Sequence, residues 1–124
     1  MIVKKPTIVI YTQHADAALL KEVCAGIEEE GVLYECIPHP DTSAAAATDA
    51  TALALLACEA SMLGVGIGIR AQMASLHIKG MNVAQNADRT TPLFFHEQPS
   101  PATSRQLGAN AARVIKKLPF RIEE

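Results

Sequence analysis

The sequence contains no tryptophan, and aromatic residues make up only 4% of its 124 residues. Surfaces that stack on nucleic-acid bases or sugar rings depend on aromatic side chains, which argues against both kinds of surface here. The formal net charge is −2, and the lysines and arginines are scattered, so no basic field attracts nucleic acid or an anionic membrane. No apolar run is long enough to span a bilayer. We therefore expect neither a nucleic-acid nor a membrane partner.

The sequence also lacks the marks of a secreted protein. Cys24, Cys36 and Cys58 are odd in number, widely spaced and set among apolar residues, as expected for reduced, buried thiols inside a cell. Residues 1–6 lead directly into a strand pattern rather than into the apolar segment of a signal peptide. These features predict a soluble, cytoplasmic protein with a single domain over residues 1–124.

Catalytic motifs are equally scarce. The sequence has no phosphate-binding glycine loop, no Cys-x-x-Cys and no His-x-x-x-His, and its four histidines lie in separate segments. A hydrolytic or transferase site needs a nucleophile with a base, a pair of carboxylates or a set of metal ligands. The sequence therefore predicts no catalytic and no cofactor-binding residue, and it favours a binding or assembly subunit over an enzyme.

What the sequence does contain is an alternation of strand-like and helix-like segments, which is typical of an α/β fold. The connection between the third and fourth strands is too short for a parallel crossover, so the fourth strand should be antiparallel. The expected architecture is a three-layer α/β/α fold with a mixed five-stranded sheet that has one antiparallel strand. The strands are expected at 7–11, 32–37, 63–69, 73–78 and 92–95, and the helices at 17–30, 48–60 and 101–118.

Glycines alternate through the third expected strand. Gly64, Gly66 and Gly68 would share one face of it and leave that face as bare backbone, so another element should pack there very closely. The dinucleotide-binding fingerprint needs its glycines on a turn that opens a helix, which these do not provide. We expect the last helix to pack on this face through its small residues Gly108 and Ala112.

Three consecutive glutamates, Glu28, Glu29 and Glu30, end the first expected helix, with Gly31 as its left-handed cap. Carboxylates at a helix C-terminus oppose the helix dipole and cost a few tenths of a kcal/mol each when exposed, so we expect something to compensate them. The apolar stripe of this helix is expected to consist of Leu20, Val23, Cys24 and Ile27.

Helical geometry turns Glu29 almost directly away from that stripe. Ala18, Ala25 and Gly26 are expected on or near the same outward surface, where small side chains would let another molecule approach closely. Two interpretations stay open from composition alone. The glutamates are either a solvated helix end or carboxylates offered to a cation, which would be a metal or a basic group of a partner chain.

The histidines are weaker candidates. His14 follows the first strand, at the sheet edge where open α/β sheets bind ligands, although a solvated loop residue is the favoured interpretation. His77 and Lys79 would share a face of the fourth strand, for which a solvated sheet edge is favoured. His96 and Glu97 would form either a polar site or an ordinary loop entrance.

In four ordered stretches the sequence resembles the small subunit of the reactivating factor of coenzyme B12-dependent diol and glycerol dehydratases. Each stretch is weakly specific alone, but together they span most of the chain. The resemblance implies a mixed five-stranded α/β fold like that of the dehydratase medium subunit. The stretches are the acidic segment 26–31, the glycine-rich strand around 65–67, His77-x-Lys79 followed by Pro92-Leu93-Phe94, and 110–113 through 119–121.

The resemblance also implies a function. Such a small subunit pairs with a large, actin-like ATPase subunit, in a heterotetramer of two large and two small subunits. The complex releases damaged cobalamin from an inactivated dehydratase by subunit exchange, in the cytoplasm or a bacterial microcompartment. Glu29 would be a ligand of a divalent metal, Mg²⁺ or Ca²⁺, shared with the large subunit, which also binds ATP. Glu22, Ala25 and Glu28 would belong to the same partner interface.

The sequence departs from this family at a few positions. The segment Thr12-Gln13-His14 lacks acidic and small residues expected there, and Lys117 stands where glycine is usual. Two alternatives stay open. One is a dehydratase medium subunit or a fragment of it. The other is a flavodoxin-like domain that binds a small molecule with the loops near His14, Pro38 and His96.

Overall fold

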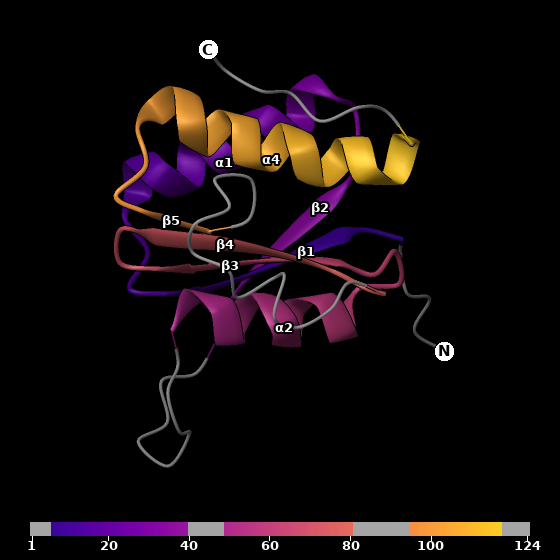
Figure 1. Cartoon of the computed structure of the whole chain (residues 1–124), viewed down its shortest axis with the longest axis horizontal. Helices are drawn as coiled ribbons and strands as arrows, with labels where there is room; N and C mark the ends of the chain where they lie inside the picture. Colours follow the sequence, from indigo (N-terminus) through magenta and orange to yellow (C-terminus); the bar gives the residue numbers. More distant parts are fainter. Residues whose placement is uncertain (1–5, 40–48, 81–94, 118–124) are drawn as a thin grey trace.

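The computed structural model describes residues 6–39, 49–80 and 95–117 (Figure 1). Within these ranges the chain forms five strands and three helices, and no helix there is long and apolar enough to cross a membrane. In chain order the elements are β1 (Ile8–Gln13), α1 (Ala17–Glu29), β2 (Tyr34–Pro38), α2 (Ala50–Ala60), β3 (Val65–Arg70), β4 (Met73–Ile78), β5 (Phe95–Glu97) and α4 (Pro101–Lys116).

The strands form one mixed sheet in the order β2-β1-β3-β4-β5. β1 is parallel to both β2 and β3, whereas β4 is antiparallel to β3 and to β5. This confirms the predicted sheet with its single antiparallel strand. The tight turn at Ala71 and Gln72 leaves no room for a crossover. Residues 92–94 of the predicted fifth strand lie outside the described residues.

Two helices cover one face of the sheet and one helix covers the other, which makes three layers (Figure 1). α1 and α4 lie side by side on the first face, over an apolar core, and α2 lies on the second face. The largest side chains of the core come from the three central strands, from α1 and from α4. They include Ile8, Ile10, Val23, Ile27, Val65, Ile67, Ile69, Leu76 and Leu107.

The glycine face of β3 packs against α2, so the prediction that the last helix covers it was wrong. A Cβ added to Gly66 would collide with the backbone nitrogen of Cys58, and one added to Gly68 would collide with the carbonyl of Ala50. Gly64 precedes the strand in a turn, with φ +72°. The close approach was predicted correctly, but its partner is the alanine-rich helix that follows β2.

Gly108 allows a second close contact between backbones, on the other face of the sheet. Its added Cβ would collide with the carbonyl of Val23, so α1 and α4 touch through their backbones there. Gly26 makes the reciprocal contact, since its Cβ would collide with the carbonyl of Arg105. The small residues of the last helix thus bring it against α1 rather than against the sheet.

Candidate functional site

The first helix begins and ends as its sequence predicts. The carboxylate of Asp16 accepts a hydrogen bond of 3.0 Å from the backbone N–H of Leu19, which caps the N-terminus. At the other end Gly31 adopts φ +75° and donates a 3.1 Å hydrogen bond to the carbonyl of Glu28. The acidic triplet therefore lies on the last turn and cap of α1, where the helix dipole disfavours negative charge.

Gly26 does not lie on the outward surface of α1, where helical periodicity predicted it. It is buried against α4, and the buried stripe consists of Leu19, Val23, Gly26 and Ile27. Leu20 and Cys24, which were expected in that stripe, are only half-buried, because α4 turns the buried face of α1 toward itself. Ala18 is exposed and Ala25 is half-buried.

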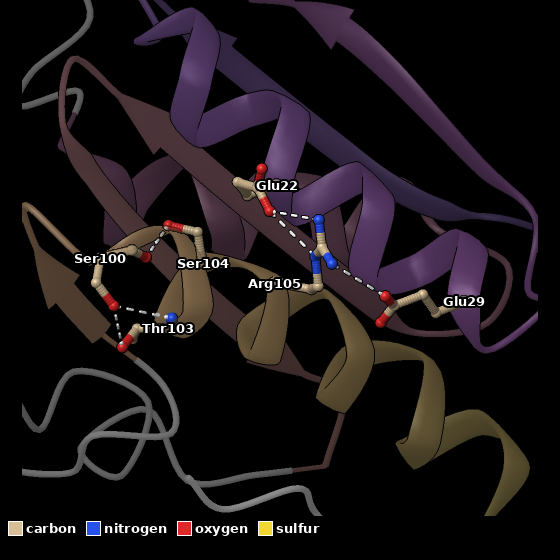
Figure 2. Close-up of polar contacts among 6 residues, drawn as sticks. All are labelled: Glu22, Glu29, Ser100, Thr103, Ser104 and Arg105. Atoms are coloured by element: carbon tan, nitrogen blue, oxygen red, sulfur yellow. Dashed lines mark hydrogen bonds and ion pairs between the residues drawn. The ribbon is translucent and has the colours of Figure 1, made fainter.

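Glu22 and Glu29 are joined by Arg105 of α4 (Figure 2). The guanidinium Nε and Nη2 lie 3.0 Å and 2.9 Å from Oε1 of Glu22, and Nη1 lies 3.3 Å from Oε2 of Glu29. Glu29 is exposed, as predicted, with 42% of its side-chain surface accessible, against 22% for Glu22. The outward carboxylate thus has a cation from its own chain beside it.

Glu30 lies nearer the core and contacts two other cations of α4. Its carboxylate lies 3.0 Å from Nε of Arg113 and 3.5 Å from Nζ of Lys116, and only 10% of its side-chain surface is exposed. Partial burial raises the pKa of the Glu30 carboxyl, but the hydrogen bonds and charges of Arg113 and Lys116 outweigh it and hold the pKa below its usual value.

Glu28 points in a third direction, toward β2. It is exposed, and the hydroxyl of Tyr34 donates a 3.2 Å hydrogen bond to its Oε2. The three consecutive glutamates therefore have three different surroundings. Of the three, only Glu29 is both highly exposed and located between the two helices. Glu22, another predicted interface residue, is linked to Glu29 through Arg105.

The cations that compensate the acidic helix end were missed by sequence reasoning. Arg105 and Arg113 are eight residues apart on α4, so they lie on one side of that helix about two turns apart. The acidic triplet required compensating charge, and this pair of arginines in the last helix was the available signal. What the sequence did not show was that α4 packs on α1.

The described side chains around the acidic helix end do not form a complete metal site. Within residues 6–39, 49–80 and 95–117, no three His, Cys, Asp or Glu side chains are placed to hold a metal ion together. Glu29 is an exposed carboxylate, which is a ligand that Mg²⁺ and Ca²⁺ accept.

A cavity of about 320 Å³ adjoins the ion-pair network at the N-terminal ends of α1 and α4. Ser100 caps α4 there by accepting a 3.1 Å hydrogen bond from the N–H of Thr103, as its position before Pro101 predicts (Figure 2). The cavity is lined by Asp16, Ala18, Leu19, Glu22, Gln72, Gln98, Pro99, Pro101 and Ser104. The surface around Glu22 is therefore hollowed.

Comparison with known proteins identifies the family. Residues 5–121 match the family model of the dehydratase medium subunit. The chain is 38% identical over 118 residues to the propanediol dehydratase-reactivating factor small subunit of Salmonella typhimurium, covering 94% of this chain and 90% of that one. It is 36% identical, over 94% of this chain and 84% of the relative, to the diol dehydratase-reactivating factor small subunit of Klebsiella michiganensis.

This chain belongs to the family of dehydratase-reactivating factor small subunits.

Solved structures of reactivating factors share its fold. A chain from the structure of diol dehydratase-reactivating factor complexed with ADP and Mg²⁺ aligns with a TM-score of 0.77 at 32% identity, over 96% of this chain and 100% of that one. A chain of glycerol dehydratase reactivase also gives 0.77, at 30% identity, over 95% of this chain and 98% of the other. The family resemblance seen in the sequence is confirmed.

The histidines do not form a common site in this reactivating-factor subunit. His14 is exposed after β1, and Pro38 ends β2 at one edge of the sheet, whereas His96 lies on β5 at the opposite edge. The loops of the flavodoxin-like alternative therefore do not converge.

His77 does not lie on a solvated edge, which corrects the favoured interpretation. It is 6% exposed, opposite Gly66 on the face that α2 covers, and its Nδ1 has no hydrogen-bond partner. Burial lowers the pKa of its imidazole, with Glu59 as a smaller opposing influence.

Proposed function

We propose that this chain is the non-catalytic small subunit of an ATP-dependent, chaperone-like reactivating factor. The factor would release damaged cobalamin from an inactivated diol or glycerol dehydratase by subunit exchange, in the cytoplasm or a bacterial microcompartment. ATP would bind to the large partner subunit, which fits the lack of a phosphate-binding glycine loop in this sequence.

One observation carries this proposal: the chain aligns along almost its whole length with small subunits named for reactivating factors. The structural match supports it, because one of the matched reactivating factors was solved as a complex with ADP and Mg²⁺. That match covers 96% of this chain and 100% of the solved chain.

The outward surface of α1 is the proposed contact with the large subunit. Glu29 would be one ligand there of a divalent metal, Mg²⁺ or Ca²⁺, whose remaining ligands the large subunit and water would supply. Its exposure supports this role. Glu22, Ala25 and Glu28 would surround it in the interface, in an assembly of two large and two small subunits.

A second candidate is a structural role as a dehydratase medium subunit. The specific observation in its favour is that the matching family model carries that description. The two candidates differ in their partner: a reactivase small subunit binds a reactivase large subunit stably, whereas a medium subunit assembles with the other dehydratase subunits.

The test is co-expression with the large subunit from the same genome, followed by size-exclusion chromatography with light scattering. We expect a stable complex of two large and two small subunits. EDTA or Glu29→Ala should weaken it, because each removes a part of the shared metal site. Glu59→Ala is the matched control, since Glu59 is an exposed glutamate on α2, on the other face of the sheet.

Each part of the proposal has its own contradicting result. Failure to bind the large subunit, together with co-purification with dehydratase subunits, would establish the second candidate instead. If the complex forms equally well with EDTA and with Glu29→Ala, the reactivase role stands and the proposed metal site at Glu29 is contradicted.

A further inference from the structure

Arg105 occupies a special position relative to the proposed interface. Glu22 and Glu29 are seven residues apart, which places them two turns apart on the same side of α1. Gly26 lies between them, and its missing side chain lets the backbone of Arg105 touch α1 at that point. The guanidinium is held between the carboxylates of Glu22 and Glu29 (Figure 2).

The two carboxylates hold Arg105 unequally. Two guanidinium nitrogens contact Oε1 of Glu22, at 2.9 Å and 3.0 Å, whereas one nitrogen contacts Glu29, at the longer distance of 3.3 Å. Glu29 is also the more exposed partner, at 42% against 22%. Glu22 therefore anchors the arginine, and Glu29 can turn toward another cation while Arg105 remains in place.

We infer that Arg105 is an internal counter-cation that competes with the metal or basic group of the large subunit for Glu29. This inference rests on the proposed role of Glu29 in that interface. A positive charge at hydrogen-bond distance from Glu29 stabilises the carboxylate in the separate subunit and repels a second cation brought up by the partner. Arg105 would thus act as a positioning residue that keeps the complex weak enough for its subunits to exchange.

A purely structural role for Arg105 predicts a different result. If the arginine only ties α4 to α1, its removal lowers stability and leaves the partner affinity unchanged or weaker. If it competes for Glu29, its removal tightens binding, and only while Glu29 is present. Partner affinity in two Glu29 backgrounds therefore separates the two roles.

The experiment measures the Kd between the purified large subunit and the small subunit by titration calorimetry in saturating Mg²⁺. We expect Arg105→Gln to tighten binding about two- to fivefold, the range that an exposed ion pair supports. Arg105→Lys keeps the charge and should stay near the wild-type Kd. Arg113→Gln is the matched control, because Arg113 lies on the same helix but pairs with Glu30. The fitted stoichiometry reports whether each variant is fully folded.

The double variant Arg105→Gln/Glu29→Gln decides the mechanism. It should bind no more tightly than Glu29→Gln alone, because the competition needs the Glu29 carboxylate. If Glu29→Gln weakens binding but Arg105→Gln does not tighten it, or tightens it equally in both backgrounds, the inference is overturned while the proposed interface stands. If Glu29→Gln leaves the Kd unchanged, the Glu29 interface itself fails, and the inference with it.

Discussion

Helices pack closely on both faces of the sheet, but the two faces differ in where their polar and charged side chains lie. On both, glycine lets a helix backbone approach closely: Gly108 and Gly26 between α4 and α1, and Gly66 and Gly68 between β3 and α2. On the first face the core is mainly apolar, with Ser104 and Asn110 of α4 as buried polar residues, and the charges of the two helices pair at the solvent boundary. On the second face polar side chains are buried beneath a single helix.

Those buried polar groups make the second face the more costly one. Ser75 is 1% exposed and His77 is 6% exposed, and neither Oγ of Ser75 nor Nδ1 of His77 has a hydrogen-bond partner. A buried polar atom left without a partner costs about 1–3 kcal/mol. On the first face, each carboxylate of the acidic triplet has a hydrogen-bonding neighbour. Surface charge is therefore compensated there, whereas the second face leaves buried polar atoms without partners.

The largest effect is expected from filling the close contacts. Gly66→Val and Gly108→Val should each destabilise the fold by about 3 kcal/mol or more, because the new side chain would meet backbone that cannot move aside. The measurement is urea unfolding followed by circular dichroism. Equal loss on the two faces would show that close helix packing matters equally on both.

Gly31→Ala is the control for this pair. Gly31 also has a special conformation, with φ +75°, but a Cβ there meets nothing within 4 Å. The cost should be about 1 kcal/mol, from backbone strain alone. A valine at Gly66 that costs no more than this alanine would contradict the close packing of α2 on β3.

A second prediction concerns acid stability, which should depend on the second face. Burial lowers the pKa of His77 in the folded protein, so the unfolded chain, with a pKa near 6.5, takes up a proton first as the pH falls. Stability should therefore be full above about pH 6.5 and decline below it until the folded pKa is reached, by at most about 1.4 kcal/mol per pH unit for this one proton.

The measurement compares urea midpoints at pH 7.5 and 5.5 for the wild type, His77→Gln and His14→Gln. His77→Gln should lose part of the acid sensitivity, and its loss is compared with the change in the exposed-site variant His14→Gln. Acid sensitivity that is unchanged in His77→Gln would show that His77 is not its source.

The sequence predicted the sheet better than the packing of the helices on its two faces. Strand character, cap residues and the short turn before β4 are local properties, and the antiparallel direction of β4 follows from that short turn. The glycines of β3 correctly predicted a close contact. They carry no information about which helix makes it, because that choice depends on long-range packing.

The candidate site was predictable only in part, for the same reason. Helical periodicity placed Glu29 outward, as observed. The same periodicity misplaced Gly26, because a buried face is set by the neighbouring helix as well as by the apolar stripe. Arg105 was missed because a cation from the other end of the chain leaves no mark near the carboxylate that it pairs with. His77 was misjudged because β4 looked like an edge before β5 and α2 were placed.

The smallest expected effect on stability concerns the C-terminal ends of the helices on the two faces. α2 ends at Ser61 in extended backbone, whereas α4 ends at Lys117 in the left-handed region, with φ 58°. A left-handed conformation strains residues with a Cβ, and glycine adopts it freely. Lys117→Gly should therefore raise the free energy of unfolding by about 0.5 kcal/mol, after a small loss of favourable charge at the helix C-terminus.

Lys117→Ala separates backbone strain from charge in this last comparison, since it removes the ammonium group but keeps the Cβ. Thermal unfolding of the three proteins should rank glycine above wild type, with alanine at or slightly below wild type, because only glycine relieves the strain. If alanine gains as much as glycine, the strain at Lys117 is absent and repulsion from Arg113 and Lys116 in the last turn of α4 is the cause instead. In that case the cations that pair with Glu30 would also destabilise this helix end. The charges of the first face would then not be fully compensated.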